Sequence, residues 1–220
     1  MKYKLLNKSI LLTLLLISLF TLFSCTSMST KEKEVDPNFI ADFDPFYLGE
    51  LICLNESSLN KIKPITIYFY FNPRINCIET RFKDGMNNIS LLWTPEQREL
   101  LSQSILEYMA LYNSDTKMED RKPTKKNAFY NSKIQLSWGL TGYSRTTDAN
   151  YYSNYQYLEP NKPYFKLNFV PTPYQFEESV SSPKIELFFS PNQLEKLFEI
   201  TDYDLIIEKI KSFESEAYDW

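Results

Sequence analysis

The chain has 220 residues, of which 24 are basic and 28 acidic, so its net charge is −4 at neutral pH. It contains no histidine, which excludes histidine-dependent triads, histidine general bases and most zinc sites. Its four glycines, Gly49, Gly85, Gly139 and Gly142, are too few and too dispersed for a phosphate-binding loop or a dinucleotide fingerprint.

A short positive region, formed by Lys2, Lys4 and Lys8, precedes an apolar stretch over Ile10–Phe23. This stretch is about 14 residues long. That length fits the core of a signal peptide and falls short of the roughly 20 residues that a spanning helix needs. We therefore predict that residues 1–24 are a signal peptide and that the chain is exported.

The stretch ends in Leu22-Phe23-Ser24-Cys25, which resembles the lipobox of bacterial lipoproteins. Leu22 and Ser24 match the branched and small residues of that motif, whereas Phe23 stands where the family prefers a small residue. The resemblance covers only the first 25 residues. It implies that acyl chains are attached to Cys25 and hold the chain at a membrane of the bacterial cell envelope, since several acyl chains together give stable anchoring.

Two alternatives stay open for this segment. No charged residue interrupts Ser9–Thr30, so the apolar stretch could be an uncleaved signal anchor. It could also be an ordinary signal peptide in which Cys25 has no role, because small residues are common at cleavage sites.

Removal of the signal peptide changes the charge balance, because three of the basic residues and none of the acidic ones precede Cys25. The mature chain then has 21 basic and 28 acidic residues, a net charge of −7. An acidic domain without a basic stripe repels nucleic acid, so we expect no nucleic-acid partner.

Residues 25–45 are polar and charged, which predicts a flexible tether. Within it, Asp36, Asp42 and Asp44 could be read as a calcium loop, but the glycine turn and the later bidentate glutamate are missing. We therefore predict no metal site and no cofactor. A carboxylate-pair hydrolase or a Ser–Lys dyad stays open because these residue types are plentiful, but no spacing identifies a catalytic residue.

The first half of residues 46–220 shows strong strand signals. Apolar residues alternate with polar ones in three successive runs, which predicts a meander of strands around Ile65–Phe71, Ile78–Phe82 and Ile89–Trp93. Thr94, followed by a proline and by Gln97, then predicts a helix start with a capping box. Apolar residues follow at helical spacing as far as Tyr112.

The second half repeats this pattern, with strand signals at 134–138, 165–169 and 185–189 and a second helix start at Ser190. The segments Ile89–Leu100 and Ile185–Lys196 share residues at five positions, which favours two units of β-meander plus helix. The alternative is that any strand that enters a well-capped helix looks like this. A last helix is predicted from the spacing of Tyr203, Ile206, Ile207, Ile210 and Phe213.

Cys53 and Cys77 lie in apolar, strand-like surroundings. In an envelope compartment the two residues could form a disulfide, which would stabilise the fold by about 3 kcal/mol. They could equally be two buried free thiols that pack as small hydrophobes.

Tyrosines gather among Ser, Thr and Asn between Gly139 and Pro163. Tyr151, Tyr155 and Tyr157 share one face of an extended segment. If this face is exposed, it is a candidate binding surface for an envelope protein or a glycan. If the rings are buried, they are ordinary core residues of an aromatic-rich chain.

We therefore predict a single α+β domain over residues 46–220, with a mainly antiparallel sheet and two or three helices packed on it. The predicted function is that of a lipid-anchored envelope lipoprotein that acts as a non-enzymatic binding or structural module. The alternatives are a histidine-free hydrolase of envelope polymers and a small-molecule binding lipoprotein of a transport system. The chain is short for a two-lobed binding protein, which disfavours the last of these.

Overall fold

The computed structural model describes residues 36–56, 61–114, 118–119 and 122–218. The fold described below is that of the unit Asn38–Trp220, which is separate from Met1–Pro37. Cys25 and the predicted signal peptide lie outside the described residues.

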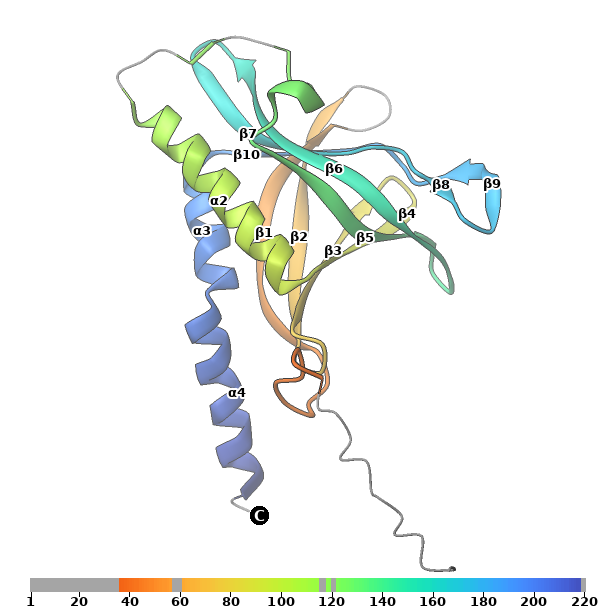
Figure 1. The fold of residues 1–220 in the computed structure, drawn as a ribbon, viewed down its shortest axis with the longest axis vertical. Coiled ribbons are helices and arrows are strands. Elements are labelled where there is room, and N and C mark those ends of the chain that lie inside the picture. The colour runs from red at the N-terminus through yellow and green to blue at the C-terminus, as the bar shows by residue number, and fades with distance from the viewer. Residues whose placement is uncertain (1–35, 57–60, 115–117, 120–121, 219–220) are drawn as a thin grey trace, which may run out of the picture. The chain divides into compact units, whose positions relative to one another are not determined.

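Ten strands and three α-helices form the described part of this unit (Figure 1). The first half contains β1 (Phe46–Glu56), β2 (Ile62–Asn72), β3 (Cys77–Asp84), β4 (Asn87–Trp93) and helix α2 (Pro95–Tyr112). A short 3-10 helix, η1 (Lys125–Asn127), leads to β5 (Tyr130–Leu140), β6 (Tyr143–Glu159) and β7 (Lys162–Phe169). The chain ends with β8 (Pro173–Tyr174), β9 (Glu177–Ser181), β10 (Ile185–Phe189), α3 (Pro191–Thr201) and α4 (Tyr203–Tyr218).

Eight of these strands form a closed barrel in the order β1-β10-β7-β6-β5-β4-β3-β2, while β8 and β9 pair separately as a small hairpin. Every neighbouring pair in the barrel is antiparallel. The barrel closes where β10 pairs with β1, with Phe188 opposite Leu54. Within the barrel as described, each strand pairs with a neighbour on both sides, so the barrel itself presents no free edge strand.

The prediction of an α+β domain with helices packed on a sheet is wrong, because the strands close on themselves and the fold is mainly β. The alternation of apolar and polar residues identifies the two faces of a strand but not the strand with which it pairs. The closing pair joins Leu54 to Phe188, far apart in the sequence, so no local pattern could have predicted it.

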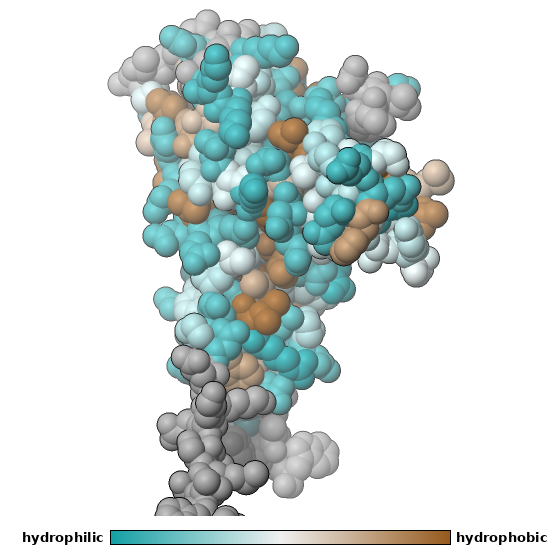
Figure 2. All heavy atoms as spheres, turned by 45° about the vertical axis from the view of Figure 1, so that its right-hand side comes forward, coloured by the Kyte–Doolittle hydropathy of each residue, from teal (hydrophilic) through white to brown (hydrophobic). Residues whose placement is uncertain are grey.

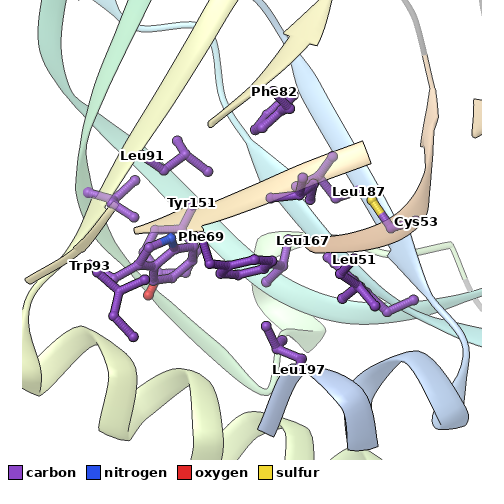
Figure 3. Close-up of a cluster of buried hydrophobic side chains, with 14 of the residues drawn as sticks. Leu51, Cys53, Phe69, Phe82, Leu91, Trp93, Tyr151, Leu167, Leu187 and Leu197 are labelled. Carbon is purple, nitrogen blue, oxygen red and sulfur yellow. The ribbon is translucent and has the colours of Figure 1, made fainter. Parts of the chain in front are cut away.

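The barrel interior is packed with the apolar residues of the alternating runs. Figure 3 shows inward-pointing side chains from several strands, among them Leu51, Phe69, Leu91 and Leu187, with Leu197 reaching toward them from α3. All five are at most 6% exposed. Burial of such side chains is the main term that stabilises the fold, at roughly 1.5–3 kcal/mol for each fully buried large aliphatic or aromatic residue.

The predicted start of α2 is confirmed. The Gln97 backbone N–H donates to Thr94 Oγ1 at 3.3 Å, and the Thr94 N–H donates to Gln97 Oε1 at 2.9 Å. At α3, the Ser190 N–H donates to Gln193 Oε1 at 2.8 Å. These bonds satisfy N–H groups that a helix start leaves without partners.

In each half, four barrel strands precede a helix, and each helix is attached to the first strand of the other half. Gln97 Nε2 on α2 donates to the Lys133 carbonyl of β5 at 2.6 Å. Gln193 Nε2 on α3 donates to the Ile52 carbonyl of β1 at 2.7 Å. Helix α2 therefore lies where β4 ends while its neighbour β5 continues. Helix α3 lies in the same way where β10 ends while its neighbour β1 continues.

Helix α4 follows α3 and packs by an apolar face, as its residue spacing predicted. Ile206 and Ile210 are buried, and the Phe213 ring lies edge-on against Phe46 with ring centroids 5.2 Å apart. Lys209 Nζ donates to the Tyr47 carbonyl at 2.7 Å. In the described part of the chain, no helix combines the length and the apolar character that a membrane-crossing helix needs.

The surface is mainly hydrophilic on the face drawn in Figure 2, where hydrophobic residues form small, separate patches. Met86 in the β3–β4 turn and Phe176 in the β8–β9 hairpin are the most exposed of the large hydrophobic residues described. Single exposed hydrophobic residues are common on soluble domains and do not by themselves indicate a binding site.

Candidate functional site

A cavity of about 510 Å³ lies between the inner surface of the barrel, helix α2 and the junction of α3 with α4. This volume is within the roughly 300–1,000 Å³ that is typical of small-molecule sites. Its barrel wall is mainly apolar, with Thr80 as a polar member, and its apolar residues come from both halves of the chain: Ile67, Phe69, Ile78, Leu91, Leu167 and Leu187.

The helices supply the other wall of the cavity. Leu101, Ser102 and Ile105 line it from α2, because residues at this spacing share one face of a helix. Leu197 and Phe198 line it from α3. Apart from Ser102, these side chains are apolar, so the body of the cavity favours a hydrophobic ligand.

Polar residues also line the cavity, among them Asn76, Arg98 and Tyr203. Asn76 lies in the β2–β3 turn with a positive φ of 49°, a conformation that asparagine tolerates better than most residues. Arg98 Nη2 donates to the Asn76 backbone carbonyl at 3.1 Å and to its Oδ1 at 2.8 Å. The Arg98 guanidinium also lies 5.8 Å from the ring centroids of Phe71 and Tyr203.

Arg98 carries a charge that the described residues do not neutralise. No described carboxylate lies within ion-pairing distance of it. Its Nε is buried and has no hydrogen-bond partner among the described residues. Burial lowers the pKa of Arg98, although the neighbouring Cys77 and Tyr203 act in the opposite direction. A partly buried guanidinium without a counter-ion is unfavourable, so this position suits an anionic group of a ligand.

Two carboxylates also line the cavity, and each already has a hydrogen-bond partner. Glu99 Oε1 accepts a bond from Gln103 Nε2 at 3.3 Å, and Asp202 Oδ1 accepts the Leu205 N–H at 3.0 Å, at the start of α4. The residues that line the cavity include Ser102 but no lysine. The described lining therefore lacks the Ser–Lys dyad that would favour a hydrolase.

The predicted tyrosine surface is not exposed. Tyr151 is 2% and Tyr155 3% exposed, because their strand β6 belongs to the barrel and these side chains point into the core. Tyr151 stacks on Phe169 with ring centroids 5.6 Å apart. Tyr155 and the partly buried Tyr157 donate to the backbone carbonyls of residues 119 and 118 at 2.9 and 3.1 Å. Burial of these rings counts against the surface as a binding site.

Cys53 and Cys77 are both free and buried in the structure. On the shared neighbour β2, Cys53 lies opposite Ile65 and Cys77 opposite Asn72. Seven residues of strand correspond to roughly 23 Å, whereas a disulfide needs Cα atoms within about 7 Å. Burial raises the pKa of the Cys53 thiol to about 12 and also raises that of Cys77.

The N-terminal part of the unit contacts the same β2–β3 turn that carries Asn76. Arg74 Nε lies 2.7 Å from Asp42 Oδ1, and Arg74 Nη1 lies 2.8 Å from Asp44 Oδ1. The Ile40 N–H donates to the Pro73 carbonyl at 2.9 Å. Asp42 and Asp44 thus pair with an arginine, and the described residues hold no group of three or more potential metal ligands.

A second polar cluster lies outside the cavity. Lys166 on β7 is 3.0 Å from Glu186 Oε1 on β10, and both side chains are less than a tenth exposed. Lys166 Nζ also donates to Gln156 Oε1 at 2.8 Å. A hydrogen bond between Glu56 and Glu186 raises the pKa of Glu56. Burial acts to raise the pKa of Glu186, but the bonds from Glu56 and Lys166 outweigh it and the pKa is lowered. This cluster is a paired structural element rather than an open site.

Sequence reasoning did not identify Arg98 or Asn76. The predicted apolar face of α2 contains Leu101 and Ile105, which line the cavity. An arginine near the start of an amphipathic helix is ordinarily solvent-exposed, so Arg98 gave no separate signal. Its position three residues before Leu101, on the face of α2 that lines the cavity, was the available indication.

Comparisons with known proteins place the chain among treponemal sequences. A family model described as "Uncharacterised Treponema protein" matches residues 20–208. An "Uncharacterized protein" of Treponema pallidum (strain Nichols) is 24% identical over 179 residues, which cover 79% of this chain and 64% of that relative. The chain thus spans less than two thirds of the length of this curated relative. No solved structure matches the chain.

Proposed function

The chain belongs to the family of uncharacterised Treponema proteins, and we propose that it is an envelope lipoprotein that binds an apolar small molecule without catalysing a reaction. The observation that carries the proposal is the cavity of about 510 Å³ between the barrel, α2 and the α3–α4 junction. A large apolar cavity with a few convergent polar groups is the usual form of a small-molecule site. A hydrocarbon ligand in this cavity would gain about 0.8 kcal/mol of binding free energy for each methylene that it buries.

The membrane tether of the proposal rests on the lipobox-like Leu22-Phe23-Ser24-Cys25. In the barrel unit itself, Arg74 of the β2–β3 turn pairs with Asp42 and Asp44. Asn76 of the same turn lines the cavity. A tethered module of this kind could exchange an apolar ligand with the membrane to which it is attached.

The tether is tested by labelling cells with radioactive palmitate. We expect label in the wild-type chain and none in Cys25→Ala, because the thiol of Cys25 is the attachment point. Equal labelling of the two chains would contradict the anchor and leave the cavity proposal unaffected.

The cavity is tested with an uncharged, hydrophobic fluorescent dye such as Nile red. Ser102→Trp places a large ring in the cavity from α2, so we expect it to abolish most of the fluorescence increase seen with the wild-type chain. The matched control is Ala110→Trp, the same new side chain on an exposed position of the same helix. Binding that is equal in both variants would show that the dye uses another site and would contradict the proposal.

A further inference from the structure

We propose that the ligand of this cavity is a single-chain carboxylate, such as a long-chain fatty acid, whose carboxylate is bound by Arg98. This inference rests on the proposed function and specifies its ligand. It requires a cation in the cavity lining, an apolar space for one chain, and a reason to prefer one negative charge over several.

The cation is Arg98. Its Nη2 is held by Asn76, while its buried Nε has no partner among the described residues. A carboxylate in the cavity would pair with the Arg98 guanidinium through charge-assisted hydrogen bonds. It would also supply the counter-ion that the described carboxylates do not. Arginine binds carboxylates through a planar fork of N–H groups, which makes this pairing directional.

The apolar space extends from Arg98 into the barrel. Leu101 and Ile105 follow Arg98 on the same face of α2, and the opposite wall is formed by Leu167 and Leu187 of the second half. A ligand whose head group contacts Arg98 therefore has hydrocarbon-lined space along the helix. An amphiphile with one polar end and one apolar chain matches this distribution of polar and apolar residues.

The charge environment favours one negative charge. Arg98 is accompanied in the lining by the carboxylates of Glu99 and Asp202. One guanidinium can neutralise one carboxylate, whereas a phosphate dianion would add repulsion from Glu99 and Asp202 without a second cation to balance it. No lysine and no second arginine line the cavity among the described residues. The lining thus discriminates against phosphate monoesters and in favour of a singly charged head group such as a carboxylate.

The test is calorimetric titration of the mature chain with dodecanoate and with dodecanol, each below the concentration at which it aggregates. The two ligands have the same chain and differ only in the charged head group. We expect dodecanoate to bind at least about ten-fold more tightly, the difference that one charge-assisted hydrogen bond supplies. Arg98→Gln should remove this preference and leave the affinity for dodecanol unchanged.

A matched control is Arg81→Gln, which removes an arginine on β3 that pairs with Glu79 outside the cavity lining. It should leave both affinities unchanged. Equal binding of dodecanoate and dodecanol by the wild-type chain would overturn the inference while leaving the proposed apolar ligand in place. Binding of neither would contradict both. If Arg98→Gln unfolds, the comparison of the two ligands on the wild-type chain still decides the question.

Discussion

Arg98 on α2 donates to two acceptors of Asn76, the backbone carbonyl at 3.1 Å and Oδ1 at 2.8 Å, and so links the first turns of the helix to the β2–β3 turn. The same two residues line the cavity. Asn76 has a left-handed backbone with φ 49°, which orients its side chain and its carbonyl toward one donor. The link fixes the guanidinium of Arg98 in place before a ligand binds.

This link predicts the effect of Asn76→Gly. Glycine keeps the left-handed backbone and its carbonyl acceptor but removes Oδ1, so Arg98 should become more mobile. We expect a several-fold loss of affinity for dodecanoate in calorimetric titration, with a small change in thermal stability. Asn76→Ala should in addition lower the unfolding free energy by about 1–2 kcal/mol, because alanine disfavours this backbone conformation. Unchanged affinity in Asn76→Gly would mean that the link does not position Arg98.

The buried pair of Lys166 and Glu186 predicts a large loss of stability on truncation. Lys166→Met removes the buried cation beside Glu186 and leaves it only the more exposed Lys184 at 3.1 Å, which should cost about 3 kcal/mol. The matched control on the same strand is Lys162→Met, which breaks an exposed pair with Glu159 at 2.7 Å and should cost less than about 1 kcal/mol. Urea unfolding measures both values. Similar losses in the two variants would contradict the burial of Lys166.

Glu79 predicts a pH-dependent contribution to stability. Burial acts to raise its pKa, but hydrogen bonds from Arg81 at 2.6 Å and from Ser90 at 2.5 Å outweigh this and lower it. Because the pKa is lower in the folded state, the contribution is present above the unfolded pKa of about 4.3 and is lost as pH falls through the folded pKa. The wild-type chain should therefore be more stable than Glu79→Gln at pH 7, by less than about 1 kcal/mol for this partly exposed pair. We expect this difference in stability to vanish in acid. A difference that grows as the pH falls would contradict the lowered pKa of Glu79 in the folded state.

The two cysteines predict a test of thiol chemistry. Burial raises the pKa of Cys53 to about 12, so little thiolate is present at pH 8 and a thiol reagent should label the native chain slowly. In guanidinium without reductant, a mature Cys25→Ser chain should label at both remaining thiols. Labelling that requires prior reduction would show a disulfide between Cys53 and Cys77 and would contradict the separation of these residues along β2.

Local structure could be predicted from the sequence where a single short pattern determines a strand face or a helix start. Ile67, Phe69 and Phe71 alternate in β2 and are buried, and Thr94 with Gln97 forms the capping box that starts α2. These features depend on residues within one turn or one strand of each other. The closure of β10 on β1 depends instead on a pairing between distant segments, which hydrophobic alternation does not encode.

The residues of the proposed ligand site were not predicted, for a related reason. Tyr151 and Tyr155 look like an exposed face when β6 is considered alone, because serine and asparagine surround them. They are buried because the strand is part of a closed barrel. Arg98 becomes a candidate only when its lack of a described counter-ion and its place beside an apolar cavity are both seen. Tertiary structure alone supplies these two facts.

The central claim, that a single-chain carboxylate occupies the cavity, is tested most directly by a crystal structure with 12-bromododecanoate. Anomalous scattering locates the bromine at the end of the chain. We expect the bromine inside the barrel near Leu167 and Leu187, with the carboxylate within hydrogen-bond distance of Arg98. A bound ligand whose bromine lies outside the cavity, or whose carboxylate points away from Arg98, would contradict it.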